Sequence, residues 1–122
     1  MIAEDRDNPA QPPPGQTLCA LAHLADPGAR SFRFREDRFL FAGFLVRQGD
    51  EVRGYVDRCP HAGWPLAVMD DRYLTRDGGR LLCTAHGALF RPLDGVCVAG
   101  PCAGDHLTPW PIAVADGLIF TA

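Results

Sequence analysis

The chain has 122 residues, of which 47% are hydrophobic, and a formal net charge of -3. This length and composition suffice for one hydrophobic core, so we expect a single folded domain. The negative net charge argues against nucleic-acid binding, and the longest apolar run is far shorter than a membrane span, which argues against a spanning helix. The first 16 residues lack a basic region followed by an apolar one, so we expect no secretion signal and a cytoplasmic protein.

Five cysteines in so short a chain could indicate a disulfide framework. The odd number and the expected absence of a secretion signal argue against it. We therefore expect reduced thiols or metal ligands.

Composition divides the chain into two parts. Residues 1–16 are polar and contain Pro9 and the run Pro12, Pro13 and Pro14, which disfavours a helix and offers little apolar area to bury. We predict a disordered tail over residues 1–16 and one folded domain over residues 17–122.

The folded part shows a pattern of short strands. No window of eleven or more residues carries a helical apolar stripe, and 13 Gly and 11 Pro would interrupt one. Short apolar or alternating runs separated by turn residues predict an all-β, antiparallel sandwich or small barrel. Asp116-Gly117 between two apolar runs predicts a closing hairpin, and the polar stretch 67–80 predicts an exposed hairpin or loop.

Two short segments carry the residues that best suit a metal site. Cys59 and His61 lie in one, and Cys83 and His86 lie in the other, with twenty-one residues between His61 and Cys83. Two thiols and two imidazoles from two loops form a complete set of four ligands. A glycine follows each histidine closely, at positions 63 and 87, and glycine lets the backbone approach a metal group or adopt a positive φ.

The order of these ligands bears on the choice of metal. Zinc also accepts two Cys and two His, but common zinc sites place Cys next to Cys and His next to His along the chain. Here the two types alternate. Alternation suits a two-iron centre in which one iron takes a Cys from each loop and the other takes a His from each loop.

Longer motifs surround these ligands. They are C-P-H-x-G-x-P-L at residues 59–66, C-x-x-H-G-x-x-F at residues 83–90, the Asp94-Gly95 turn, Gly100-Pro101 and the final strand pair. From about Thr17 to its end, the chain resembles the Rieske ferredoxin family. The connection between the two loops is several residues longer than the commonest family pattern, and a surface insertion of that kind costs little.

The resemblance implies both a fold and a cofactor. The fold would be an antiparallel Rieske-type sandwich of three small sheets, with a cluster-binding subdomain at one tip. The cofactor would be a [2Fe-2S] cluster, with Cys59 and Cys83 on the inner iron and His61 and His86 on the outer, partly exposed iron.

Comparison with high-potential members of the family predicts a low reduction potential. Those members have an extra Cys in each loop, and the two cysteines form a disulfide. At the corresponding positions this chain has Trp64 and Ala85. They also place Ser and Tyr hydroxyls, which donate to cluster sulfurs, where this chain has Ala88 and Phe90. We expect a potential toward the bottom of the range of about -150 to +300 mV for Rieske sites.

The resemblance implies a soluble one-electron carrier, either a ferredoxin component or a small subunit of a redox system such as an oxygenase. Its partners would be a flavoprotein reductase and a terminal oxidoreductase. We do not expect an enzyme, because beyond the four ligands only His23 and His106 remain for a catalytic iron, and there is no length for a second domain. The alternative is a sensor or a structural metal-binding module that holds a cluster or zinc.

Two further expectations concern residues around the site. Cys19, Cys97 and Cys102 are interpreted as structural residues. A partner would meet the tip that carries the outer histidines, formed by Trp64, Pro65, Gly87, Ala88, Gly100 and Pro101.

Overall fold

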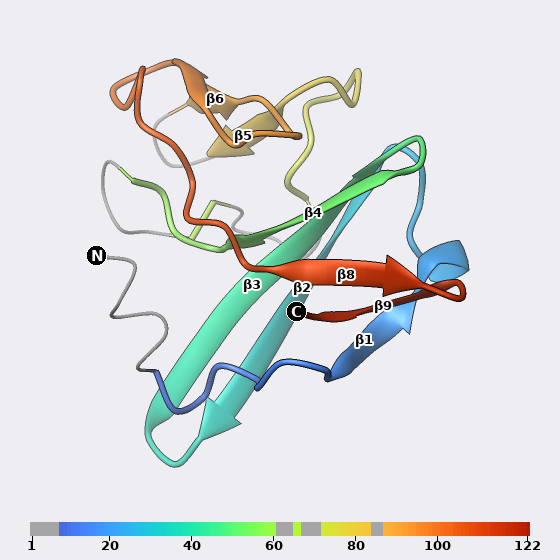
Figure 1. Cartoon of the computed structure of the whole chain (residues 1–122). Coiled ribbons are helices and arrows are strands. Elements are labelled where there is room, and N and C mark those ends of the chain that lie inside the picture. Colours follow the sequence, from blue (N-terminus) through green and yellow to red (C-terminus); the bar gives the residue numbers. More distant parts are fainter. Residues whose placement is uncertain (1–7, 61–64, 67–71, 84–86) are drawn as a thin grey trace.

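The structure, a computed structural model, describes residues 8–60, 65–66, 72–83 and 87–122. Within these ranges nine strands form three antiparallel sheets of three strands each (Figure 1). Sheet A has the order β1 (Thr17–Ala20), β9 (Leu118–Thr121), β8 (Ile112–Ala115), and sheet B the order β2 (Gly28–Glu36), β3 (Phe39–Gln48), β4 (Glu51–Val56). Sheet C has the order β5 (Leu81–Cys83), β6 (Ala88–Phe90), β7 (Cys97–Ala99). The predicted all-β fold of three small sheets is confirmed.

Strand β3 is apolar along both faces and contributes side chains to two buried clusters. Phe41 and Leu45 belong to one buried cluster, whereas Phe44 and Val46 belong to another. Successive side chains of a strand point to opposite faces, so the continuous apolar run of β3 is what a strand covered on both sides requires. The cluster of Phe44 and Val46 also contains residues of sheet C, which stands at the top of Figure 1, apart from sheet A.

Trp110 is the centre of the cluster on the Phe41 face. It is 2% exposed, and its ring centroid lies 5.2 Å from that of Phe41, 6.1 Å from that of Phe32 and 6.3 Å from that of Phe34. The backbone of Gly43 lies directly against this ring, because a Cβ added there would meet Trp110 Cε3 at 2.6 Å. The indole therefore packs against sheet B where a glycine leaves room for it.

The chain ends in the predicted hairpin. Strands β8 and β9 pair from Ile112 with Thr121 to Ala115 with Leu118. Asp116 and Gly117 connect them with φ of 53° and 74°, the left-handed values that a two-residue hairpin turn requires.

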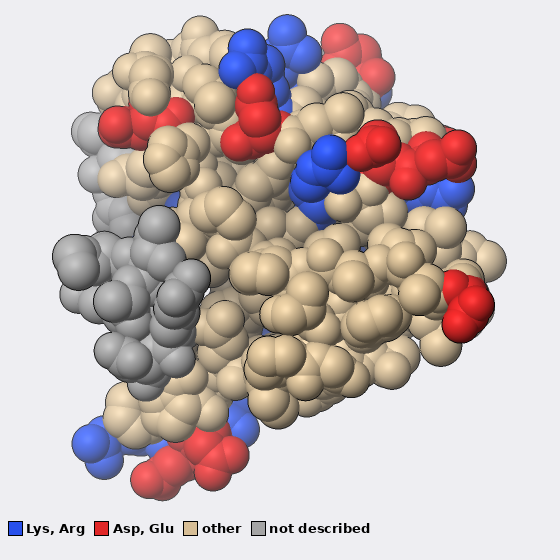
Figure 2. Space-filling model, viewed as in Figure 1, with Lys and Arg blue, Asp and Glu red and all other residues tan. Residues whose placement is uncertain are grey.

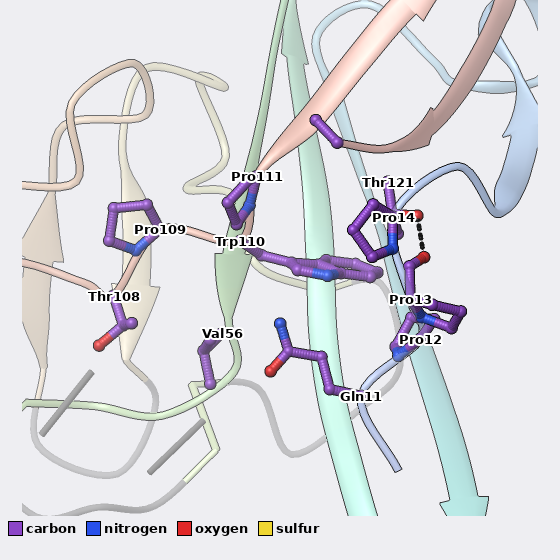
Figure 3. A pocket seen from close by; sticks show the side chains of 11 residues that line it. Gln11, Pro12, Pro13, Pro14, Val56, Thr108, Pro109, Trp110, Pro111 and Thr121 are labelled. Carbon is purple, nitrogen blue, oxygen red and sulfur yellow. Dashed lines mark hydrogen bonds between the residues drawn. The ribbon is translucent and has the colours of Figure 1, made fainter. Parts of the chain in front are cut away.

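The expected tail over residues 1–16 differs from the structure in the part that is described, residues 8–16. Ala10 and Pro12 are buried there. The Thr121 hydroxyl donates to the carbonyl oxygen of Pro13 at 2.6 Å, and the amide of Gly15 donates to the carbonyl oxygen of Thr121 at 2.7 Å. Proline has a fixed φ and a free carbonyl group, so this segment loses little conformational entropy when it packs beside Trp110 (Figure 3).

The stretch predicted as an exposed hairpin or loop is described from residue 72 onward. It forms a tight turn in which Thr75 and Arg80 pair through the backbone and Leu74 bridges Leu81. Tyr73 lies at its start and is only 1% exposed. The turn is therefore anchored at its base by a buried aromatic side chain that the polar composition of the stretch did not indicate.

No helix in the described ranges is long and apolar enough to cross a membrane.

Trp110→Ala should lower the free energy of unfolding by about 3–5 kcal/mol, since it leaves a large cavity among three aromatic rings. Denaturant unfolding followed by circular dichroism measures this loss. Phe39→Ala is the matched control, because that ring is 39% exposed at the tip of the β2–β3 hairpin, and its removal should cost less than about 1 kcal/mol. Equal losses in the two variants would contradict the central position given to Trp110.

Candidate metal centre

Two of the four predicted ligands lie in the described part of the chain. Cys59 follows β4 and is 1% exposed, and Cys83 is the last residue of β5 and is 0% exposed. Both belong to the buried cluster that joins β3 to sheet C. The other two predicted ligands, His61 and His86, lie outside the described residues, as do Trp64 and Ala85.

Asp57 anchors the segment that carries Cys59. Its side chain is 6% exposed; Oδ1 accepts the backbone N–H of Leu66 at 2.9 Å and Oδ2 accepts the hydroxyl of Tyr73 at 2.8 Å. Burial, together with the neighbouring Asp57 group, raises the pKa of Tyr73. This one side chain connects the end of β4, the end of the first ligand segment and the strand-like residues before β5.

Asp57 and Tyr73 are not among the site residues predicted from the sequence. An acidic residue two positions before a predicted ligand, directly after an apolar strand, is the signal that could have found Asp57. The partner could not have been identified, since Tyr73 lies sixteen residues further on in a polar stretch.

The second ligand segment is closed by Gly87. Its N–H donates to the carbonyl oxygen of Cys83 at 2.8 Å, and its φ is 72°. A left-handed φ at this position favours glycine, which confirms the predicted need for glycine after the second histidine. Gly63, its counterpart in the first segment, lies outside the described residues.

A third segment packs closely against the second. Gly100 has a φ of 97°, and a Cβ added to it would lie 2.8 Å from the Cα of Ala88. Ala88 follows Gly87 and pairs with Cys83 across the β5–β6 ladder. The Gly100-Pro101 turn is thus held at backbone contact with the strand that leaves the second ligand segment.

Cys102 lies beside two other thiols. Its Sγ donates to Cys97 Sγ at 2.8 Å. Burial, with the neighbouring sulfurs of Cys97 and Cys59, raises the pKa of Cys102 to about 12. Four of the five cysteines, all except Cys19, belong to the same buried cluster.

The described donors fit an iron–sulfur cluster in their chemistry and in their surroundings. Thiols are the ligands that iron–sulfur clusters take, and Cys59 and Cys83 are buried in one apolar cluster. Glycines in the left-handed region let backbone amides approach cluster sulfurs without a side chain in the way. In the described ranges, which contain only these two of the four predicted ligands, no three His, Cys, Asp or Glu side chains converge on a metal position.

The residues predicted to form the contact surface differ in their exposure. Pro65, Gly87, Gly100 and Pro101 are exposed, whereas Ala88 is 0% exposed and packs against Gly100. Ala88 therefore belongs beneath the tip and not to a surface that a partner could touch.

One cavity lies away from these cysteines. It measures about 480 Å³ and is lined by residues 11–14, 108–111 and 121–122, and by Val56 (Figure 3). The lining contains no Cys or His. On the face in Figure 2, acidic and basic side chains lie in small mixed groups, and no broad patch of one sign is seen.

Comparison with protein families gives one match, to the Rieske [2Fe-2S] domain model, over residues 17–113. No curated protein sequence matches the chain.

Solved structures share the fold. The ferredoxin of carbazole 1,9a-dioxygenase from Nocardioides aromaticivorans is 22% identical with a TM-score of 0.65, over 91% of this chain and 98% of that one. A second match is a chain from a carbazole-bound complex between the oxygenase and the ferredoxin of carbazole 1,9a-dioxygenase. It is 18% identical with a TM-score of 0.69, and the match covers 87% of this chain but only 27% of that one. The present chain thus spans the length of the ferredoxin and about a quarter of the longer chain.

Gly100→Ala should destabilise the protein more than Gly104→Ala. Both glycines have a left-handed φ, of 97° and 95°, so both substitutions carry the backbone cost of about 1–2 kcal/mol. Only at Gly100 does the new Cβ also meet a backbone, whereas at Gly104 nothing lies within 4 Å. Thermal unfolding and the rate of iron loss measure the difference, and indistinguishable variants would show that the contact with Ala88 has no role.

Proposed function

Because the chain belongs to the Rieske [2Fe-2S] domain family, we propose that it is a one-electron carrier, the ferredoxin component or small subunit of a redox system such as an oxygenase. The cofactor of the family is a [2Fe-2S] cluster, which takes up and gives back a single electron. The observation that carries the proposal is the burial of Cys59 and Cys83 together in one apolar cluster, inside a domain that matches the family model from residue 17 to residue 113.

In this proposal Cys59 and Cys83 hold the inner iron, and His61 and His86 hold the outer one. Buried thiols support this division, because an inner iron needs ligands out of contact with water. Asp57 keeps the first segment in place through Leu66, and Gly87 closes the second. These residues would limit the rearrangement of the ligands when an electron arrives or leaves.

We further propose that the donor is a flavoprotein reductase and the acceptor a terminal oxygenase. One solved neighbour is a complex of reduced oxygenase and oxidized ferredoxin in carbazole 1,9a-dioxygenase. The matched chain is 22% identical with a TM-score of 0.65, over 87% of this chain and 90% of that one. In this proposal the exposed residues Pro65, Gly87, Gly100 and Pro101 would form the contact tip, and a small tip suits the brief, limited contact of electron-transfer partners. We place the carrier in the cytoplasm, where its five cysteines, an odd number, would stay reduced.

The purified chain should be red-brown and contain about two iron and two sulfide per chain. After reduction it should give a Rieske-type EPR signal, and a reductase with its nicotinamide cofactor should reduce it reversibly without loss of iron. Cys83→Ser should lose the cluster, whereas Cys19→Ser, at a buried cysteine in the other core, should keep it. A colourless protein with one zinc would overturn the proposal, and a cluster that the reductase cannot reduce would favour the structural alternative.

Ala88→Ser should raise the midpoint potential. A hydroxyl that donates to a cluster sulfur stabilises the reduced, more negative form, and a charge-assisted hydrogen bond of about 1.5 kcal/mol corresponds to about 60 mV in a one-electron couple. Ala113→Ser in β8 of sheet A is the matched control and should leave the potential unchanged. A potential of Ala88→Ser that agrees with the unaltered protein would contradict the hydrogen-bond explanation of a low potential.

A further inference from the structure

Cys97 and Cys102 form a thiol pair that the proposed ligand set does not use. Their sulfurs are 2.8 Å apart, with the Cys102 thiol donating to Cys97 Sγ, and the Cys97 thiol in turn donates to the carbonyl oxygen of Ala99 at 3.2 Å. Each residue is 2% exposed. The two thiols are thus in direct contact beneath the surface.

The backbone holds this pair together. The N–H of Cys97 donates to the carbonyl oxygen of Asp105 at 2.7 Å, and its carbonyl oxygen accepts the N–H of Gly104 at 3.0 Å. The N–H of Asp105 also donates to the carbonyl oxygen of Cys102 at 2.8 Å. Because these bonds close the segment 97–105 on itself, the two cysteines cannot move apart unless several of them break.

The access to the pair suits a small reagent. The residues next to Cys102, Pro101 and Ala103, are exposed, as is Val98 next to Cys97. Because each cysteine is 2% exposed, a reagent reaches the sulfurs only when the turn opens, and a peroxide of two oxygen atoms needs a smaller opening than a bulky disulfide reagent.

We propose that Cys97 and Cys102 are an oxidisable dithiol, a modification site outside the proposed ligand set, which hydrogen peroxide converts to a disulfide within the 97–105 segment. The Cys97 sulfur, which accepts the hydrogen bond of the Cys102 thiol, loses its proton and attacks the peroxide; the O–O bond breaks, and a sulfenic acid and one water form. The second thiol sulfur attacks the first, the S–S bond forms, the S–O bond breaks, and a second water leaves. Two thiols and one peroxide thus yield one disulfide and two waters.

Contact between the sulfurs determines the product. A sulfenic acid at one cysteine meets the other thiol at once, and such proximity is equivalent to a very high local concentration of the second reactant. The disulfide should therefore form before further oxidation to sulfinic acid. Cys19 belongs to the other core, without another cysteine in its cluster, and should not form such a bond.

The test uses the cluster-loaded protein treated with a stoichiometric amount of hydrogen peroxide in the absence of oxygen. Free thiols are then alkylated, and peptides are sequenced by mass spectrometry. A bond between Cys97 and Cys102 should be found at least about tenfold more often than any other pairing. Its formation should remove two hydrogen atoms from the intact mass, and a dithiol reductant should restore them.

Variants separate this pair from the other cysteines. Cys97→Ser and Cys102→Ser should each abolish the bond, and Cys19→Ser should form it as the unaltered protein does. Recovery of Cys97 and Cys102 as alkylated thiols, or a bond of Cys59 to Cys102 or to Cys83 in place of the Cys97–Cys102 bond, would overturn the proposal. Since the unaltered protein alone gives this answer, a serine variant that fails to fold does not prevent the test, and the result is independent of whether the cluster carries electrons.

Discussion

The buried side chain of Asp57 is the contact on which the arrangement of the candidate site depends. It lies where β4 ends, and it holds Leu66 beyond the first ligand segment and Tyr73 before β5. Each hydrogen bond of this kind contributes about 1–3 kcal/mol when a partner would otherwise be left unpaired in the interior. Without it, sheets B and C would still pack through their apolar faces, but the segment that carries Cys59 would lose the hydrogen bond that ties its far end, at Leu66, to the end of β4.

Sheet C owes its position to the two-sided character of β3. Phe44 stacks on Tyr73, with ring centroids 4.2 Å apart and planes at 11°, and lies 5.7 Å from Tyr55. The other face of β3 is occupied by Trp110 and its aromatic neighbours. Cys59 and Cys83 thus lie in the core that joins β3 to sheet C, while sheet A and the proline segment complete the other core.

Close backbone contact distinguishes the tip of sheet C from an ordinary hairpin. Gly100 touches Ala88, and Gly87 closes back on Cys83, so three segments of the chain meet with very little side-chain volume between them. A backbone that carries little side-chain volume lets amide groups approach a cofactor closely. This arrangement also places the Cys97 and Cys102 pair directly below the turn that reaches Ala88.

The sequence alone determined the strands, the hairpin at Asp116-Gly117 and the four candidate ligands, because these follow from local alternation, from the special φ that two turn residues require and from the spacing of residue types. The structure describes Cys59 and Cys83 but not His61 and His86, and all four stay predictions as ligands.

Only the tertiary structure revealed the partners of Asp57, the burial of Ala88, the packing of residues 8–16 and the contact between Cys97 and Cys102. Each of these depends on where distant segments meet or how a turn closes. Tyr73 is sixteen residues from Asp57, and Pro13 is 108 residues from Thr121. Local patterns record which face of a strand is apolar, but not which segment will cover it, because that choice is made by the packing of the whole chain.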